Sequence, residues 1–403
     1  MAGAVGCLLP GSREDAARRV ETYWSDRGDT MAAYSVRSGF DLLLQALDLE
    51  QGDEVLFSAL NVKGMIKIAR RHGFTPVPLD LDVAHFAPSV ERLEAAITPR
   101  SKVLVVAHLF GCLIELDPLF DLARRHGLVI VEDCAQAFDG HRFAGHPKAD
   151  VSMFSFGPLK TATALGGALI KVHNGDVLHR MRDIQAAYPV QKNRKHLKRV
   201  AQFTGLKLVS TRPVLGLISR LFSAFGKSYD DAFVDRARNV APLGGFKNLR
   251  HQPSLGMLRL MHRRISRFAE GGLEPRAGKG RLLRDMIGDA VVMPGQANKE
   301  HNYWVFPLLV DDPRAYIAGL RRQGFDSSDL PRSQAVAAPE GRENLAPNMA
   351  AQALSDLIIV PCYPDMPDEE LARQAETIKR LARELGAERT KSYAEYPTTQ
   401  PGQ

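Results

Sequence analysis

The sequence has few of the features that mark secreted, metal-binding or membrane-spanning proteins. Its 403 residues include four cysteines, and Cys7, Cys112, Cys134 and Cys362 do not form the close pairs that bind zinc. No apolar run approaches the ~20 residues that cross a bilayer. The first residues lack the basic and apolar regions of a signal peptide. We therefore expect a cytoplasmic protein with reduced cysteines and no metal.

Acidic residues are missing from one long segment, 184–229, which contains nine Lys or Arg. Subtracting these nine charges from the net charge of +7 leaves −2 for the rest of the chain. Within the segment, a basic cluster at 192–199 precedes apolar residues at helical spacing in 214–225. Without aromatic residues among the basic ones, the segment does not predict nucleic-acid binding.

Two interpretations of this segment stay open. It is either a helical insertion that packs on its own domain or on a partner subunit, or a basic amphipathic helix, within 192–226, that contacts a membrane surface or a lipid-linked substrate. The second interpretation would place the protein peripherally at the inner membrane face. A polyanionic substrate such as a nucleotide diphosphate would also be attracted by this charge.

The length predicts two domains, and 45% hydrophobic with 25% charged residues is typical of a soluble globular protein. A helix is expected at 13–27, capped near Ser12. The predicted divisions are an N-terminal arm (1–28), a large α/β domain with the basic insertion (29–250), a small α+β domain (251–386) and a polar tail (387–403).

Strand-like and helix-like segments alternate at short spacing through the first half of the chain. This pattern predicts an open, mostly parallel α/β sheet flanked by helices. Ligands bind at the carboxyl ends of such strands, where Asp133, His108 and 58–62 would lie. The strands are expected at 54–59, 75–82, 102–110, 128–133 and 151–156, and the helices at 64–73, 88–97 and 115–126. The small domain is expected to contain strands 302–310 and 357–360 and helices 313–323 and 368–385.

The segment 129–170 contains the residues with the clearest chemistry. A buried strand ends at Asp133, the next strand ends at Ser155, and Lys160 follows in a turn. Pyridoxal phosphate needs an amine for its Schiff base, an acid at its ring nitrogen and hydroxyl or N–H groups around its phosphate. A single loop lysine is usually a solvated charge, but its combination with Asp133 in an α/β pattern favours this cofactor.

Several short motifs in the same order also carry a family resemblance. HLFG (108–111), EDCAQAF (132–138), FSF (154–156) and Lys160 ahead of two glycines resemble the DegT/DnrJ/EryC1/StrS aminotransferases, which are sugar aminotransferases of fold type I. Weaker similarity continues to about residue 385. The resemblance implies a large cofactor domain with a smaller C-terminal domain, a homodimer, and pyridoxal 5′-phosphate with pyridoxamine phosphate as the intermediate form.

The implied reaction moves an amino group from an amino acid, commonly glutamate, to a keto-sugar nucleotide or related keto substrate. Such products serve polysaccharide, glycolipid or natural-product biosynthesis. Two alternatives remain, namely another pyridoxal-phosphate reaction such as elimination or epimerisation, and a non-catalytic regulatory protein that has kept the fold.

The resemblance also assigns roles to individual residues. Lys160 would form the Schiff base and then transfer the proton, and Asp133 would pair with the ring nitrogen. Gln136 would pack near the ring hydroxyl, Ser155 would donate to the phosphate, and Asn248 would reach the phosphate of the neighbouring subunit. His108 is expected to be structural rather than catalytic.

The sequence departs from the family pattern at two of the expected cofactor-binding positions. The family's Ser-Gly-Thr turn at a helix start is here Ser38-Gly39-Phe40, so Gly39 and Phe40 would bind phosphate through the backbone alone. Val62 stands where the family places an aromatic residue on the cofactor ring. Another aromatic side chain would then have to cover the ring, or the cofactor would be held less tightly.

Overall fold

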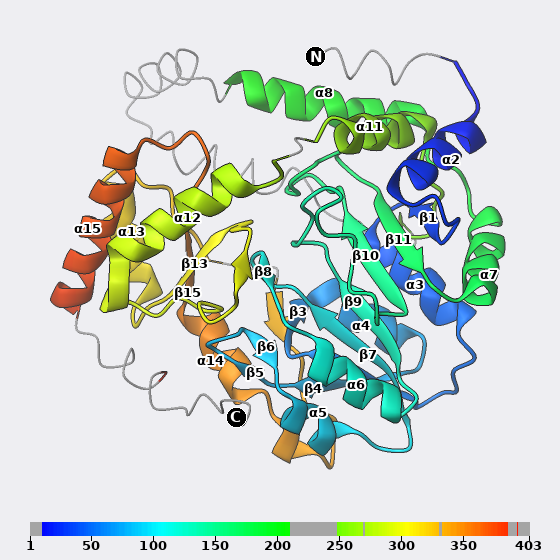
Figure 1. Cartoon of the computed structure of the whole chain (residues 1–403), viewed down its shortest axis with the longest axis horizontal. Helices are drawn as coiled ribbons and strands as arrows, with labels where there is room; N and C mark the ends of the chain where they lie inside the picture. Colours follow the sequence, from blue (N-terminus) through cyan, green and yellow to red (C-terminus); the bar gives the residue numbers. More distant parts are fainter. Residues whose placement is uncertain (1–9, 210–247, 269–270, 330–332, 386–392, 394–403) are drawn as a thin grey trace.

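The computed structural model describes the chain except for residues 1–9, 210–247, 269–270, 330–332, 386–392 and 394–403. The expected helix at 214–225 and nearly all of the polar tail lie outside the described residues. The predicted α/β class is confirmed, because the described part is built around one mostly parallel sheet with helices on both faces (Figure 1).

The central sheet has seven strands in the order β1-β11-β10-β9-β7-β2-β4. The five strands from β4 to β10 run parallel, whereas β11 is antiparallel to both β10 and β1. The strands are β1 (Thr30–Ala33), β2 (Glu54–Ser58), β4 (Thr75–Leu79), β7 (Ser101–Ala107), β9 (Val129–Asp133), β10 (Val151–Ser155) and β11 (Ala168–Val172).

Both faces of the sheet are covered, which explains why its strands read as continuous apolar runs. In β7, Val103 and Val105 pack into the cluster under one set of helices, while Leu104 and Val106 pack into the cluster on the opposite face. The first set is α3 (Val36–Ala46), α4 (Lys63–Arg71) and α7 (Gly175–Ala186), and the second is α5 (Val90–Ala96) and α6 (Asp117–Arg125).

The expected N-terminal helix is present as α2 (Arg13–Trp24), and Ser12 caps it by accepting a hydrogen bond from the N–H of Asp15. It ends three residues earlier than expected because Ser25 is extended. Trp24 packs edge-on against Phe154 of β10 with ring centroids 4.8 Å apart. The arm is therefore fixed directly to the strand that precedes Lys160.

Helix α11 (Leu255–Ser266) packs between α2 and α8 (Asn193–Val209), as Figure 1 shows. It contributes Met257, Leu258 and Met261 to the same apolar cluster as Phe154. The chain reaches the smaller cluster only with α12 (Glu274–Ile287). The domain boundary near 250 stays a prediction, and the first helix after it shares the core of the large sheet.

The smaller cluster joins α12 with α13 (Pro313–Arg322), α15 (Asp368–Leu385) and the antiparallel pair β13 (Phe306–Leu309) and β15 (Leu357–Val360). The strand expected at 302–310 is shorter than predicted, because 302–304 form a turn in which Tyr303 has a φ of 46°. The described chain also contains α14 (Asn348–Asp356) and the 3₁₀ turns Gly288–Ala290 and Glu343–Leu345.

Three small two-stranded sheets lie outside the central sheet, and two of them connect distant parts of the chain. β14 (Ser333–Ala335) pairs with β3 (Leu60–Val62), and β12 (Glu300–His301) pairs with β8 (Cys112–Leu113). The third joins β5 (Leu81–Asp82) to β6 (Ala87–Pro88). The first two pairings bring C-terminal segments to the loops that follow β2 and β7, which is where the predicted site lies.

Candidate active site

Lys160 lies in the loop between β10 and β11. The backbone of Phe156 anchors both ends of this loop, since its carbonyl accepts from the N–H groups of Ala164 and Gly166 and its N–H donates to the carbonyl of Gly167. The lysine is half-buried. Burial disfavours the charged ammonium and lowers the pKa of Lys160 to about 8, against the opposing effect of the nearby Asp133 carboxylate. The amine is therefore more reactive than a solvated lysine.

Asp133 is the last residue of β9 and is buried. Its Oδ1 accepts a hydrogen bond of 3.0 Å from the N–H of Ala135, and Oδ2 has no hydrogen-bond partner among the described residues. Burial raises the pKa of Asp133, while the charge of Lys160 acts in the opposite direction. The two side chains influence each other without forming a direct ion pair in the described part of the structure.

Trp304 is a residue of this site that the sequence did not predict. Its ring lies against the amine of Lys160, with Nζ 4.2 Å from the ring centroid, and its indole N–H donates to the carbonyl of Leu159 at 3.0 Å. The backbone N–H of Trp304 is held by Asn302 Oδ1. An aromatic residue thus lies against the lysine, contributed by the turn before β13. Whether it covers the cofactor ring in place of position 62 stays a prediction. The sequence offered one signal for this residue: Trp304 is one of only two tryptophans in the chain and lies in a short segment of polar and aromatic residues.

Gln136 follows β9 and Ser155 ends β10, and their side chains differ in how far protein groups already occupy them. The side-chain carbonyl of Gln136 accepts a 2.6 Å hydrogen bond from the N–H of Phe110, whose φ is 59°. Gln136 therefore secures the left-handed turn after β7. The hydroxyl of Ser155 only accepts a long contact, 3.5 Å, from the N–H of Gly157, so it can still donate to a ligand. Their contacts with a cofactor stay predictions.

The prediction that the turn at Gly39 and Phe40 begins the helix is wrong. The helix starts one turn earlier, at Val36, because Ser35 caps it and accepts from the N–H of Ser38. The N–H of Gly39 is already bonded to the carbonyl of Ser35. Phe40 is fully buried against Phe57. These two residues serve helix packing in this structure, and Gly39 cannot donate its N–H to a phosphate without breaking the first helical turn.

Val62 and Asn248 are not brought into contact with Lys160 or Asp133 within the described part. Val62 is 38% exposed at the end of β3, where it pairs with Ser333. Asn248 is exposed and begins the segment that leads to Arg250, whose guanidinium pairs with buried Asp41 at 3.0 Å. The role of Asn248 toward a neighbouring subunit stays a prediction.

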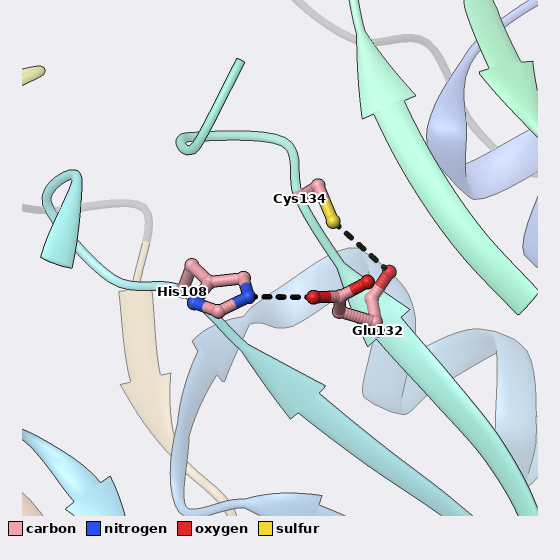
Figure 2. Close-up of side chains that lie close together, drawn as sticks. All are labelled: His108, Glu132 and Cys134. Atoms are coloured by element: carbon pink, nitrogen blue, oxygen red, sulfur yellow. Dashed lines mark hydrogen bonds and ion pairs between the residues drawn. The ribbon is translucent and has the colours of Figure 1, made fainter. Parts of the chain in front are cut away.

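Behind the site, His108, Glu132 and Cys134 form a buried cluster (Figure 2). The Nδ1 atom of His108 accepts from the N–H of Ile114, which leaves Nε2–H to donate to Glu132 at 2.9 Å. The other carboxylate oxygen of Glu132 accepts from Ser152 and from the N–H of His146. These bonds lower the pKa of Glu132 to about 2 despite its burial.

This cluster has the residue types of a metal site but not its chemistry. The oxygens of Glu132 already accept hydrogen bonds from protein donors. Burial and the neighbouring carboxylates raise the pKa of the Cys134 thiol, whereas a metal binds the thiolate. The expected structural role of His108 agrees with these contacts, because it holds the loop after β7 against β9.

Comparison with solved structures identifies the class to which this fold belongs. The chain superposes on Helicobacter pylori PseC, an aminotransferase involved in the biosynthesis of pseudoaminic acid, with a TM-score of 0.67, 14% identity and coverage of 95% of this chain and 96% of that one. For 3-amino-5-hydroxybenzoic acid synthase the TM-score is 0.66 at 16% identity, with 93% and 92% of the two chains covered. The fold is that of these aminotransferases.

Residues 17–210 match the model of the DegT/DnrJ/EryC1/StrS aminotransferase family. It is 34% identical over 155 residues to the UDP-N-acetyl-3-dehydro-alpha-D-glucosamine 3-aminotransferase of Acidithiobacillus ferrooxidans, which covers 37% of this chain and 42% of that protein. It is 35% identical over 144 residues to the GDP-perosamine synthase of Caulobacter vibrioides, covering 35% and 38%. The matches thus span about two fifths of these relatives' lengths.

The residues present fit pyridoxal phosphate at its reactive centre. Lys160 supplies an amine that is partly neutral near pH 7, and Oδ2 of Asp133 is an acceptor without a protein donor in the described structure. Lys160 would hold the aldehyde carbon, Asp133 the ring nitrogen and Ser155 the phosphate. The fit is weaker at the expected helix turn, where the N–H of Gly39 is already used.

Proposed function

We propose that this protein is a pyridoxal-phosphate-dependent aminotransferase that moves an amino group from an amino acid, most simply glutamate, to a keto-sugar nucleotide or related keto substrate. The product would serve polysaccharide, glycolipid or natural-product biosynthesis. The observation that carries the proposal is the half-buried amine of Lys160, with its pKa lowered to about 8, beside the buried carboxylate of Asp133.

The cofactor, when bound, supplies a ring that stabilises negative charge at the carbon next to the transferred nitrogen. Lys160 Nζ would hold the cofactor and would then accept and return the proton at that carbon. With a pKa of about 8, roughly a tenth of the amine is neutral at pH 7. Asp133 would keep a proton at the ring nitrogen by carrying the opposite charge, and the ring of Trp304 would shield the amine from water.

Assembly and location complete the proposal. We infer a homodimer in which Asn248 reaches the partner's site, since its exposure leaves it accessible to a second chain. We also infer that the protein acts in the cytoplasm, with contact through 192–226 to a membrane face or a lipid-linked substrate. In the described part of the chain, no helix combines the length and the apolar character needed to cross a membrane.

Two alternatives use the same fold. Elimination or epimerisation would need the same lysine and acid, so the product decides between them. A regulatory role is favoured by a different relative, the pleiotropic regulatory protein of Geobacillus stearothermophilus, which is 26% identical over 354 residues, covering 85% of this chain and 82% of that protein.

The test uses the purified full chain, pyridoxal phosphate and labelled glutamate. We expect visible absorption of the bound cofactor, borohydride trapping of the cofactor on the peptide that contains Lys160, and release of labelled 2-oxoglutarate. Lys160→Ala should abolish all three, and the exposed control variant Lys67→Ala should retain them. Cofactor trapping without 2-oxoglutarate would favour another reaction, and no trapping at all would favour the regulatory alternative.

A further inference from the structure

A cleft with a basic rim lies where the chain enters α8, outside the site described above. Its volume is about 540 Å³, and it is lined by residues before and in the first turns of α8 together with one histidine from the segment after Asn248. The lining residues that concern its chemistry are Lys192, Arg194, Lys195, Lys198, His251 and Val190.

The positive charge of this cleft is not balanced by the protein. The lining includes no Asp or Glu, and the three lysines and Arg194 are exposed and form no ion pair with the described residues. By contrast, Lys148 near α6 contacts both Asp117 and Asp121. The like charges repel each other, and cations in the first turns also oppose the dipole of α8. These residues therefore do not stabilise the helix on which they lie.

The backbone that carries the cleft is held in place by contacts with the segment before α11. Gln252 bridges to the segment before α8, with Gln191 N–H donating to Gln252 O and Gln252 N–H donating to Pro189 O, both at 3.0 Å. Asn193 Oδ1 accepts from the N–H of Gly256 at 3.0 Å. The backbone that carries the cationic side chains is thus held in place, so these side chains can contact one ligand together.

His251 adds a polar atom that the described protein does not use. Its Nδ1 is buried and has no hydrogen-bond partner there, although the residue lines the cleft. An imidazole nitrogen beside four cations can donate a hydrogen bond to an oxyanion. Val190, which is 46% exposed, supplies an apolar wall next to these groups.

We propose that this cleft binds the phosphate groups of a phosphate-bearing ligand. Lysine and arginine side chains are the usual partners of phosphate oxygens, and several cations at one place match a diphosphate better than a single charge. The phosphate can come from a nucleoside diphosphate or from an anionic lipid headgroup. Binding of a nucleoside diphosphate rests on the proposed function, since the cleft would then hold the nucleotide part of the activated sugar. Phosphate binding itself does not rest on that function.

The cleft also has a direct connection to the loop of Lys160. The side-chain amide of Gln191 donates to the hydroxyl of Tyr34 at 3.3 Å, and the carbonyl of Tyr34 accepts from the N–H of Gly167 at the end of that loop. Tyr34 and His251 also have ring centroids 5.8 Å apart. A ligand in the cleft would therefore contact residues that support the catalytic loop.

The experiment measures binding without turnover, using the full-length, cofactor-loaded protein. The probes are UDP, inorganic pyrophosphate, and vesicles of phosphatidylglycerol or of phosphatidylcholine. The cleft variant carries Lys192→Gln, Lys195→Gln and Lys198→Gln together. A matched control carries Lys67→Gln, Arg70→Gln and Lys207→Gln, which removes the same charge from exposed positions elsewhere. Circular dichroism verifies that both variants are folded.

We expect the cleft variant to bind UDP and pyrophosphate at least about tenfold more weakly, equivalent to about 1.4 kcal/mol, while the control stays within about twofold. His251→Ala should weaken binding in the same direction. Binding of phosphatidylglycerol vesicles alone, lost in the cleft variant only, would identify the lipid headgroup as the source of phosphate. No binding of any probe, or equal losses in the two triple variants, would overturn the proposal. Because no amino donor is present, these results do not depend on transamination.

Discussion

The indole ring of Trp304 covers the amine of Lys160, whose Nζ lies 4.2 Å from the ring centroid. The two residues come from different parts of the chain, the loop before β11 and the turn before β13. The hydrogen bond from Trp304 Nε1 to the carbonyl of Leu159 fixes the ring beside the lysine's own backbone. The segment that leads into the small C-terminal core thereby contributes directly to the environment of the candidate catalytic amine.

Replacing this ring should change the titration of Lys160. A ring face attracts the ammonium form by about 0.5–1 kcal/mol at a partly exposed site. Trp304→Leu should therefore lower the pKa of Lys160, now about 8, by roughly half a unit. The measurement is the pH dependence of the rate at which cofactor-free protein attaches pyridoxal phosphate, followed by borohydride trapping.

Trp304→Phe is the matched control, because it also loses the hydrogen bond to Leu159 but keeps an aromatic face. Its midpoint should lie between those of the wild type and the Leu variant. An unchanged midpoint in Trp304→Leu would show that the ring does not act on the amine.

The charge of Lys160 should also lower the free energy of unfolding of the cofactor-free protein. Its folded-state pKa of about 8 lies below the ordinary value of 10.5, so below pH 8 the folded protein holds a charge that the unfolded chain solvates better. This cost disappears as pH rises from 8 to 10.5. Lys160→Met should therefore stabilise the protein by on the order of 1 kcal/mol at pH 7, and less at pH 10. Urea unfolding at both pH values measures the difference.

Lys67→Met serves as the control, because Lys67 is exposed on α4 and its replacement should leave stability nearly unchanged at both pH values. If Lys160→Met were less stable than the wild type at pH 7, the buried charge would not be the dominant effect at this position.

The sheet could be predicted from the sequence because its signal is local. β10 begins at the expected residue and β9 one residue later than expected, and β15 and α15 have the predicted bounds. The prediction of Asp133 and Lys160 as site residues used the same local signal, since Asp133 ends β9 and Lys160 lies in the loop after β10. Alternation of strands and helices is then enough to bring them to one edge of the sheet.

The features that could not be predicted from the sequence depend on long-range contacts or on which of two residues caps a helix. Trp304 is 144 residues from Lys160, and no periodicity links the two positions. The start of α3 was missed because Ser35 and Ser38 are both suitable caps, and the burial of Phe40 against Phe57 selects the earlier one. Gln136 was expected at a cofactor, but its amide first satisfies the turn at Phe110.

The Glu132 cluster should control acid stability. Glu132 has a folded-state pKa of about 2, below its ordinary 4.5, so its contribution is complete above pH 4.5 and is lost as pH falls toward 2. Glu132→Gln leaves the donors of His108 and Ser152 poorly matched in a fully buried site. We expect a loss of about 3 kcal/mol at pH 7, and a smaller difference from the wild type at pH 3.

Urea unfolding at pH 7, 4 and 3 provides this comparison, with Glu94→Gln, at an exposed position of α5, as the control. The control should follow the wild-type curve. A Glu132→Gln difference that is constant from pH 7 to pH 3 would mean that the carboxylate is not the group whose protonation destabilises the fold.

Asp133→Asn separates the charge of this residue from its shape. The amide keeps an acceptor for the N–H of Ala135 but cannot carry the charge that holds a proton on the cofactor ring nitrogen. Pyridoxal phosphate should dissociate at least about tenfold more readily, equivalent to about 1.4 kcal/mol. The cofactor-free protein offers a second readout: because the Asp133 charge raises the pKa of Lys160, its removal should move the labelling midpoint below 8. Asp48→Asn, at a side chain that is 96% exposed, should change neither quantity. Unchanged cofactor affinity together with an unchanged midpoint would mean that Asp133 and Lys160 do not act on the same ligand.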